Sequence, residues 1–396
     1  MIPPAPGKTA EYILPLRWTD DSDLPDLATY LRRLTGWIAV TVVDGSAPDL
    51  FEHHCRVFPP AVRHLRPMAE TGSARPGEAG VGRAGNGKVA GVMTGVRVST
   101  ADLLVIADDD VRYTRESLAA VVQHLSSADV VRPQNYYDRL PWHARWDTAR
   151  TLINRAWSAD FPGTLALRRS TLVAAQGYDG VLFENLELIR TIKAAGGCEK
   201  VVPDLFVARR PPKARHFLKQ RVRHAYDDFA QPRRLGAELA LLPAILAAAR
   251  LPGRLRVSAL LSLAAASAVA AGIGRRRNRG AAVFPFDTVW FAPLWTVERA
   301  ACVWIALGFR LAGGMPYAGS RIKTAAHSEA ELRLRHAGIR HPASGIRIVW
   351  ISTATQSRSR NEPGTSRELH CGLPRWAAHC ARRLRTRHTV RRTGAP

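Results

Sequence analysis

Leu103-Leu104-Val105-Ile106-Ala107-Asp108-Asp109-Asp110 is the stretch of sequence that decides the fold. Five apolar residues without a polar face predict a strand buried on both sides, which is typical of a parallel sheet covered by helices. Three carboxylates follow where this strand must end. Ligands of open α/β sheets bind beyond the carboxyl ends of the strands, so we expect these acids to lie at a ligand site. The alternative is an acidic turn that caps a helix beginning near Thr114.

Three adjacent carboxylates repel one another, and a hard divalent cation relieves this repulsion. Mg²⁺ or Mn²⁺ would also bridge the oxygens of a phosphate group. The acidic turn therefore predicts a site for a phosphorylated ligand and a metal.

The segments before the acidic strand predict a βαβ unit. Tyr12–Leu16 and Val40–Val43 are apolar strands, and an apolar stripe between them predicts a helix that begins after Asp20 and ends near Gly36. Such a unit implies parallel strands, so Asp44 would lie on the same sheet edge as Asp108. A carboxylate there can accept hydrogen bonds from a nucleotide base or ribose, and an Asp-Gly turn is the alternative.

Two further segments bring charged residues to helix starts. Gly72–Gly87 reads as a loop, after which Lys88 begins an apolar helix and could meet a phosphate or remain solvated. Glu184 and Glu187 are three residues apart in the first turn of another predicted helix, which ends at Gly196-Gly197. This spacing lets both carboxylates point from one face into a cleft.

The amino-acid composition changes after Pro232. Apolar runs at 235–249, 257–274 and 283–311 predict a membrane-associated helical region over 235–312, after a catalytic domain at 8–234. The middle run is about 18 residues, close to the length that spans a bilayer, and a buried helical domain is the alternative. Residues 328–396 lack hydrophobic periodicity, and we expect them to form a basic, disordered tail.

The net charge of +24 suggests phosphate-rich partners. From Ser328 onward there are fourteen arginines, four glutamates and no lysine, so much of the charge lies in the tail. No aromatic-interleaved basic motif accompanies it, which argues against nucleic acid as a partner.

In this order, the motifs resemble the inverting family-2 glycosyltransferases of the GT-A fold. The similarity is greatest to the membrane-bound branch that contains ceramide glucosyltransferases and bacterial hopanoid or ceramide sugar transferases, and it covers roughly Glu11 to Leu235. The marks are Val43-Asp44-Gly45-Ser46, Asp108-Asp109-Asp110 as the D-x-D site, Gly177-Tyr178-Asp179 before Glu184-Asn185-Leu186-Glu187, and Gln220-Arg221-Val222-Arg223-His224 in place of Q-x-x-R-W.

This resemblance implies a Rossmann-like domain that binds a nucleotide-diphosphate sugar, followed by membrane-associated helices. It implies that Asp44 holds the base, that Asp108 and Asp110 position the sugar diphosphate through the metal, and that Arg223 neutralises the departing diphosphate. Lys88 and Gln220 complete the expected donor site.

The chain departs from the family pattern at two site positions. Asn185 stands where many relatives have the catalytic Asp, and an amide cannot act as a base. His224 replaces the closing Trp of Q-x-x-R-W. The base is therefore Glu184 or Glu187, and we favour Glu184 because it directly precedes the position that relatives use.

These observations predict a metal-dependent hexosyltransferase at the cell membrane, with its catalytic domain in the cytoplasm. The expected donor is a UDP- or GDP-sugar, and the expected acceptor is a lipid or lipid-linked molecule. The alternatives are a polyprenyl-phosphate sugar synthase and an inactive scaffold that binds nucleotide sugars.

Overall fold

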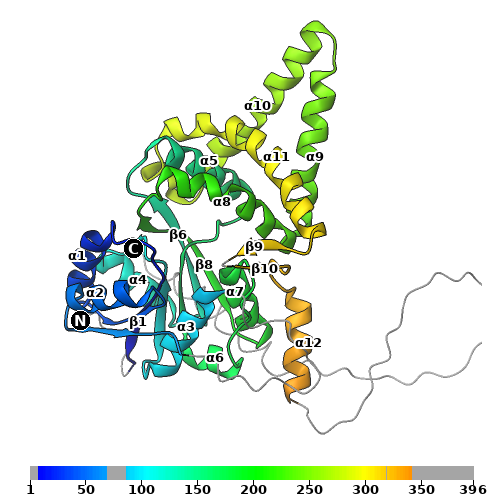
Figure 1. Cartoon of the computed structure of the whole chain (residues 1–396). Helices are drawn as coiled ribbons and strands as arrows, with labels where there is room; N and C mark the ends of the chain where they lie inside the picture. Colours follow the sequence, from blue (N-terminus) through cyan, green and yellow to red (C-terminus); the bar gives the residue numbers. More distant parts are fainter. Residues whose placement is uncertain (1–7, 69–85, 318, 341–396) are drawn as a thin grey trace, which may run out of the picture. The chain divides into compact units, whose positions relative to one another are not determined.

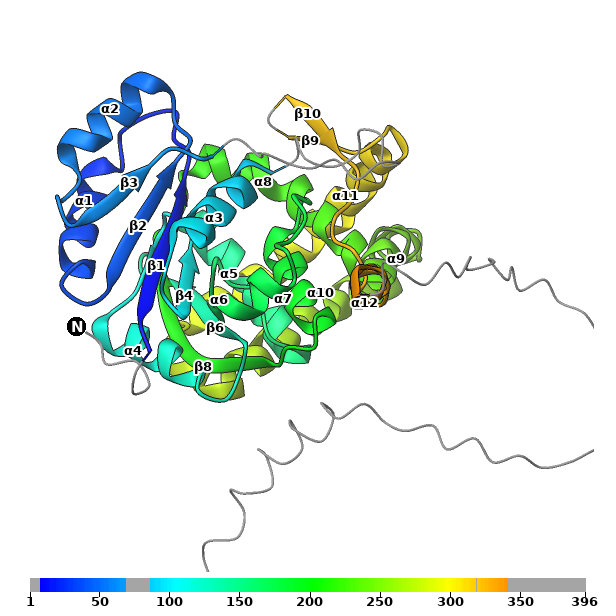
Figure 2. The ribbon, with the colours of Figure 1, turned by 90° about the horizontal axis from the view of Figure 1, so that it is seen from below.

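The computed structural model describes residues 8–68, 86–317 and 319–340, and the chain divides into the units Met1–Leu332 and Arg333–Pro396. The first unit contains an eight-stranded mixed sheet with helices on both faces (Figures 1 and 2). Its strand order is β3-β2-β1-β4-β7-β6-β8-β5. The strands are β1 Ala10–Leu16, β2 Ala39–Asp44, β3 Val62–Leu65, β4 Leu103–Ala107, β5 Val111–Arg112, β6 Val130–Tyr137, β7 Thr164–Arg168 and β8 Glu199–Arg209.

The first four strands of the sheet run parallel. β1 pairs with β2 on one side and with β4 on the other, and β2 also pairs with β3. Helix α1 (Leu24–Leu34) connects β1 to β2, which confirms the predicted βαβ unit. β7 pairs antiparallel with both β4 and β6, whereas β6 and β8 pair parallel to each other, so the sheet is mixed and β3-β2-β1-β4 is its all-parallel half.

Side chains alternate along the buried strands between two cores. Tyr12, Val105 and Ala107 face α1 and α4 (Arg115–His124), whereas Ile13 and Ile106 face the opposite side. All five residues of β4 are at most 3% exposed, which confirms that this strand is buried on both faces.

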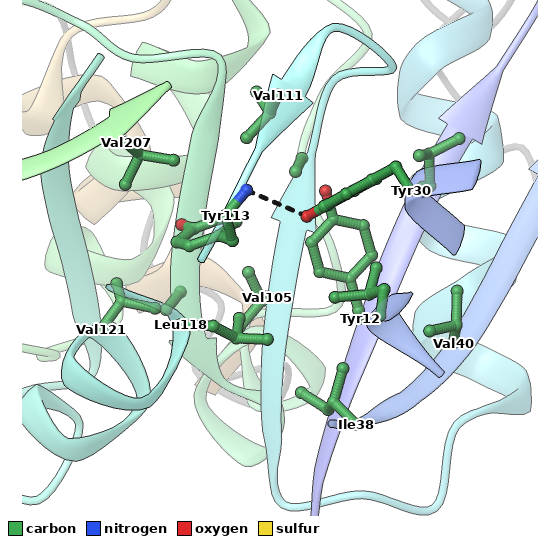
Figure 3. Packing of buried hydrophobic residues seen from close by; sticks show 14 of the residues in the cluster. Tyr12, Tyr30, Ile38, Val40, Val105, Val111, Tyr113, Leu118, Val121 and Val207 are labelled. Carbon is green, nitrogen blue, oxygen red and sulfur yellow. Dashed lines mark hydrogen bonds between the residues drawn. The ribbon is translucent and has the colours of Figure 1, made fainter. Parts of the chain in front are cut away.

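The first of these cores holds three tyrosines and is shown in Figure 3. Tyr12 meets the rings of Tyr30 and Tyr113 edge to face, and the Tyr113 backbone N–H donates to the Tyr30 hydroxyl over 3.0 Å. This contact joins α1 to the segment that follows the acidic turn. It therefore holds the turn against the parallel half of the sheet.

The remaining helices pack on both halves of the sheet, since α3 contacts β1 and β2 and α5 contacts β6. Helices α3, α6 and α7 contribute to the second core. Helix α10 packs on α5, and α11 packs on α8 and α9. Their bounds are α2 Pro48–Val57, α3 Gly87–Val98, α5 Trp142–Trp157, α6 Arg169–Ala174, α7 Glu184–Ala194, α8 Ala214–Tyr226, α9 Pro232–Ala249, α10 Gly253–Arg276 and α11 Ala292–Leu311, with short 3₁₀ helices η1 Asp227–Ala230, η2 Arg277–Ala282 and η3 Phe286–Phe291.

The apolar runs after Pro232 form α9, α10 and α11. Within the described residues, one helical stretch, Gly253–Ala282, has the length and composition to cross a membrane, with a mean hydropathy of 1.9 and 11% of its apolar window buried. In Figure 1, α9 and α10 lie side by side as a hairpin.

Two short strands, β9 (Met315–Tyr317) and β10 (Ser320–Ile322), follow α11 as an antiparallel pair. The last described element is α12 (Glu329–Arg340), where the sequence predicts no regular structure. Glu329 and Glu331 lie in the first turn of α12, where acidic side chains favour a helix. The rest of the predicted tail lies outside the described residues, as does most of the predicted loop at 72–87.

Candidate active site

The acidic turn lies between β4 and β5, at the carboxyl end of the parallel strands. The Asp108 backbone N–H donates to the Gly163 carbonyl over 2.8 Å, and the two-residue strand β5 pairs with the end of β8. This pairing places Arg209 beside Asp110. The guanidinium donates to both Asp110 oxygens over 2.7–3.1 Å, which is a bidentate charge-assisted contact.

Lys88 connects the acidic turn to the first turn of α7. Its Nζ lies 2.5 Å from Asp108 Oδ1 and 2.7 Å from Glu184 Oε1. Asn86 caps α3 by accepting the Lys88 backbone N–H and also donates to the Val181 carbonyl. The fold therefore brings Lys88 and Glu184, which are 96 residues apart in the sequence, together at the acidic turn.

Burial and like charges shift the titration of this group. Burial raises the pKa of Asp110 against the opposing effect of Arg209, and burial together with Asp110 raises the pKa of Asp109 to about 6. Burial alone would lower the pKa of Lys88, but the carboxylates of Asp108 and Glu184 outweigh burial and raise it. The ammonium and guanidinium groups thus compensate a crowded anionic site.

The surroundings of Asp108 fit a divalent cation. Its side chain is 23% exposed and that of Asp110 is 25% exposed, so both carboxylates are accessible oxygen ligands. Gly163 leaves space against them, because a Cβ at this position would lie 2.5 Å from Asp108 Oδ2. Asp108 and Asp110 are the side chains that would hold the ion. Lys88 and Arg209 balance part of the negative charge of these two carboxylates.

Asp44 lies in a closed hydrogen-bonded cluster at the end of β2. Its Oδ1 accepts from the Ser46 backbone N–H over 2.8 Å, while Oδ2 contacts His54 Nδ1 at 2.6 Å and His64 Nε2 at 3.1 Å. The side chain is fully buried. Burial acts to raise the pKa of Asp44, but bonds from His64 and His54 outweigh burial and hold it well below its usual range. Both carboxylate oxygens are thus bonded within the fold.

Glu187 is also enclosed, more completely than Glu184, which is 7% exposed. The side chain of Glu187 is fully buried, and its oxygens contact the His327 backbone N–H at 2.8 Å and His327 Nδ1 at 2.7 Å. Glu187 therefore ties the segment after β10 to α7. Glu184 instead faces Lys88 and Asn86.

Two groups of described side chains have the ligand types and proximity to hold a metal ion besides the acidic turn. They are Asp44, His54 and His64, and Asp179, Glu187 and His327. The hydrogen bonds described above engage Asp44 in the first group and Glu187 in the second, and Asp179 Oδ2 lies 3.6 Å from His327 Nδ1.

Helix α8 carries the predicted Q-x-x-R element. The Arg223 guanidinium lies over the Tyr317 ring at 5.1 Å and donates to the Leu182 carbonyl over 3.5 Å. Burial would lower the pKa of Arg223, but the charges of Asp227 and Glu184 outweigh burial and raise it. Gln220 lies on the same helix with its Nε2 2.6 Å from His216 Nε2. The charge of Arg223 thus interacts with the acidic side chains of the site, whereas Gln220 contacts a residue of its own helix.

The two departures from the family pattern have defined places. Asn185 Nδ2 donates to the Pro162 carbonyl over 3.1 Å. His224 is partly buried, and its Nδ1 accepts from Arg221, which also binds Asp147. Burial and the neighbouring Arg221 hold the pKa of His224 well below its usual range. These side chains support the fold around α7 and α8.

Sequence reasoning did not identify Arg209, Gly163 or Tyr317. Tyr317 follows the apolar helices in the chain, yet its hydroxyl donates to Asn86 Oδ1 over 3.0 Å. Its ring lies under Arg223. No local pattern marks these residues, because each reaches the site through pairing between distant segments.

Comparison with known proteins finds similar folds but no family. No protein-family model and no characterised protein matches the chain by sequence. Similar solved structures include a mannosyltransferase from Pyrobaculum calidifontis in complex with GDP-mannose and Mn²⁺, which is 17% identical over 76% of this chain and 89% of that chain, with a TM-score of 0.38.

Two other similar structures are phosphoglycerate glycosyl synthases. Glucosyl-3-phosphoglycerate synthase from Mycobacterium tuberculosis, in complex with Mn²⁺, UDP and phosphoglyceric acid, is 16% identical over 53% of this chain and 73% of that chain, with a TM-score of 0.34. Mannosyl-3-phosphoglycerate synthase from Rubrobacter xylanophilus is 15% identical over 55% of this chain and 71% of that chain, with a TM-score of 0.35.

Proposed function

We propose that this protein is an inverting GT-A glycosyltransferase that moves a hexose from a UDP- or GDP-sugar to a lipid or lipid-linked acceptor. The observation that carries the proposal is the convergence of Asp108, Asp110 and Glu184 with Lys88 and Arg209 at the carboxyl edge of the sheet. In such a reaction, cations stabilise the departing diphosphate and a carboxylate accepts the proton of the acceptor hydroxyl.

The donor diphosphate binds next to Lys88 and Arg223 in this proposal. A bound Mg²⁺ or Mn²⁺ would add Lewis-acid stabilisation of the leaving diphosphate. Lys88 pairs with Glu184 in the ligand-free arrangement. A phosphate that attracts Lys88 would leave Glu184 as an unpaired carboxylate beside the sugar.

The acceptor hydroxyl then attacks the anomeric carbon from the side opposite the diphosphate. The new bond joins the acceptor oxygen to the anomeric carbon as the bond to the diphosphate oxygen breaks. Glu184 accepts the hydroxyl proton, and the nucleoside diphosphate departs with the bonding electron pair. A single displacement of this kind inverts the configuration at the anomeric carbon.

The lipid acceptor is proposed because of the apolar helices after Pro232. Large apolar side chains such as Leu255, Leu261 and Trp290 are more than 60% exposed. An exposed apolar surface of this kind is typical of membrane interaction. We place the protein at the cytoplasmic side of the cell membrane, where UDP- and GDP-sugars would meet the acceptor.

Asn185 favours a second candidate, transfer to a polyprenyl phosphate. A phosphate acceptor is already ionised at neutral pH, so that reaction needs no general base where relatives have an Asp. The same substitution is the reason to retain an inactive sugar-binding scaffold as the third outcome. Glu184→Gln separates the first two candidates, because it would abolish transfer to a hydroxyl and spare transfer to a phosphate.

The test is a donor screen with membranes that contain the full chain. UDP- and GDP-sugars, the donor types in the similar structures, are supplied with and without Mn²⁺, and lipid products are analysed by mass spectrometry. Asp108→Asn should abolish product, and the exposed Asp49→Asn is the matched control. Donor binding without any product or hydrolysis would identify the scaffold instead.

A further inference from the structure

The hairpin of α9 and α10 exposes an apolar surface that the rest of the described chain does not cover. Leu255, Val257 and Leu261 are 58–64% exposed. Further exposed side chains on the same hairpin are Leu246, Leu251, Val269 and Ile273. The base of the hairpin is fixed, because a Cβ at Gly274 would lie only 1.8 Å from the Leu152 carbonyl oxygen on α5.

The hairpin is strongly basic. Between Glu238 and Asp287 the sequence contains no acidic residue, and its arginines are Arg250, Arg254, Arg256, Arg275, Arg276, Arg277 and Arg279. Arg250, Arg254 and Arg256 lie at the turn between the helices and are exposed. No ion pair among the described residues includes these three arginines, and apolar leucines lie between them.

The free part of the hairpin is shorter than a bilayer core. Helix α10 packs into the core under α5 from Ala268 onward, so Gly253 to Ser267 is the part without such packing. Fifteen residues at 1.5 Å each extend about 22 Å, against a hydrocarbon core of about 30 Å. A spanning hairpin would also have to carry three arginines across the membrane, which opposes the usual bias of cytoplasmic arginine.

We infer that the α9–α10 hairpin docks on an anionic lipid surface from one side and does not cross it. The leucines enter the boundary between headgroups and acyl chains, and the arginines remain among the phosphates. This replaces the predicted membrane-spanning role of the middle apolar run with an interfacial role. Docking on lipid does not depend on catalytic activity. Only the presentation of the acceptor by the docked hairpin rests on the proposed function.

Flotation of the full chain with vesicles tests the docking. We expect binding to vesicles of phosphatidylcholine with 30% phosphatidylglycerol, and at least tenfold weaker binding to phosphatidylcholine alone or in high salt. Arg254→Gln with Arg256→Gln should weaken binding about thirtyfold, because each arginine near an anionic surface contributes about 1 kcal/mol. The exposed pair Arg32→Gln with Arg33→Gln is the matched control.

The apolar contribution has its own variant. Leu255→Ser with Leu261→Ser should weaken binding at least tenfold, whereas Val173→Ser with Val201→Ser, also exposed, should leave it unchanged. The basic residues after Ser328 are identical in all variants, so the differences isolate the hairpin. Thermal melts of each variant check that the fold is retained.

Trypsin sealed inside the vesicles distinguishes docking from crossing. We expect the lumenal protease to leave the chain intact, and cleavage after Arg250 or Arg254 would overturn the inference. Binding that ignores both hairpin variants, or that is equal on neutral vesicles, would also overturn it. Donor hydrolysis measured in detergent reports on the proposed function separately, since no lipid surface is present there.

Discussion

Asp44 and Asp108 each lie at the carboxyl end of a parallel strand, with β1 between the two strands. Asp44 is fully buried, and both of its oxygens are bonded to Ser46, His54 and His64. Asp108 is partly exposed and shares Lys88 with Glu184. The position at a strand end is the same, and the neighbouring side chains make the difference.

This difference indicates that an acidic strand end can accept a ligand only where the groups that compensate its charge can move. The imidazoles of His54 and His64 are held in a packed aromatic cluster with Phe51 and Phe58. Lys88 has a flexible side chain, and a phosphate or metal can replace its contact with Asp108. The β4 end is therefore an open site and the β2 end a closed one.

Loss of the base gives the largest expected effect on the open site. Glu184→Gln keeps the shape but removes basicity, so turnover to a hydroxyl acceptor should fall about 100- to 10,000-fold while the donor Kd is unchanged. Steady-state kinetics and donor calorimetry measure both, and a lower donor Kd would mean that Glu184 and the phosphate compete for Lys88. The exposed Glu52→Gln is the matched control, and Glu187→Gln should reduce stability more than turnover. If Glu187→Gln alone abolished turnover in folded protein, the roles would be reversed.

The closed site is tested by Asp44→Asn. The amide leaves His64 without its carboxylate and His54 with Asp21 as its remaining one, so the free energy of unfolding should decrease by about 3 kcal/mol. Urea denaturation gives this value. The family resemblance assigns Asp44 to the nucleotide base, whereas the closed cluster assigns it to the fold. An unchanged donor Kd in the folded variant supports the fold role, and a donor Kd raised tenfold or more at unchanged stability would contradict it.

The pH dependence of the closed site has a definite sign. The pKa of Asp44 is lower in the folded protein than its unfolded value of about 3.9, so its contribution is complete above that value and is lost as pH falls. Asp44→Asn should remove this loss, so the acid limb of its stability profile should be flatter than that of the wild type below about pH 4.

The open and closed sites also show what the sequence can predict. The apolar run Leu103–Ala107 and the periodicity of the first βαβ unit are local, and both predicted the parallel half of the sheet. The acids that follow β4 and begin α7 were marked by their position in these elements. Local patterns therefore singled out Asp108, Asp110 and Glu184, whose roles in the site stay predictions.

The missing partners depend on long-range pairing. Arg209 reaches Asp110 because the two-residue strand β5 pairs with the end of β8, and neither strand end has a distinctive pattern. The histidine cluster depends on α2, in which His54 is the buried residue, so no apolar stripe marked that helix. Closure of the Asp44 site could not be predicted without knowing that α2 and β3 lie beside β2.

Gly163→Ala probes how much space the open site needs. A Cβ here would lie 2.5 Å from Asp108 Oδ2 and 3.1 Å from Arg209 Cζ, so the carboxylate must shift. We expect roughly tenfold lower kcat/KM, with a stability loss of about 1–2 kcal/mol, since overpacking costs of this size are usual. Gly36→Ala, whose Cβ would lie 3.3 Å from the Arg33 carbonyl, is the control. Full activity in Gly163→Ala would show that Asp108 can move freely.

The smallest expected effect is at Asp227, which is a third carboxylate to compare with Asp44 and Asp108. Its carboxylate is buried near Arg223 and Glu184, and its Oδ1 has no hydrogen-bond partner in the described part of the chain. Burial raises the pKa of Asp227 to about 7, with Arg223 opposing this rise. The folded protein therefore binds a proton more tightly than the unfolded chain, in which the pKa is about 3.9.

The sign follows from that difference. Asp227 stabilises the fold fully below about pH 4, and this contribution is lost as pH rises through about 7. Asp227→Asn keeps the shape without a charge, so its stability relative to the wild type should increase by about 1 kcal/mol between pH 6 and pH 7. Thermal unfolding at the two pH values measures this change. A relative stability that stays constant would mean that Asp227 remains ionised at both values because Arg223 holds it, and would place Asp227 with Asp44 as a carboxylate closed by its partners.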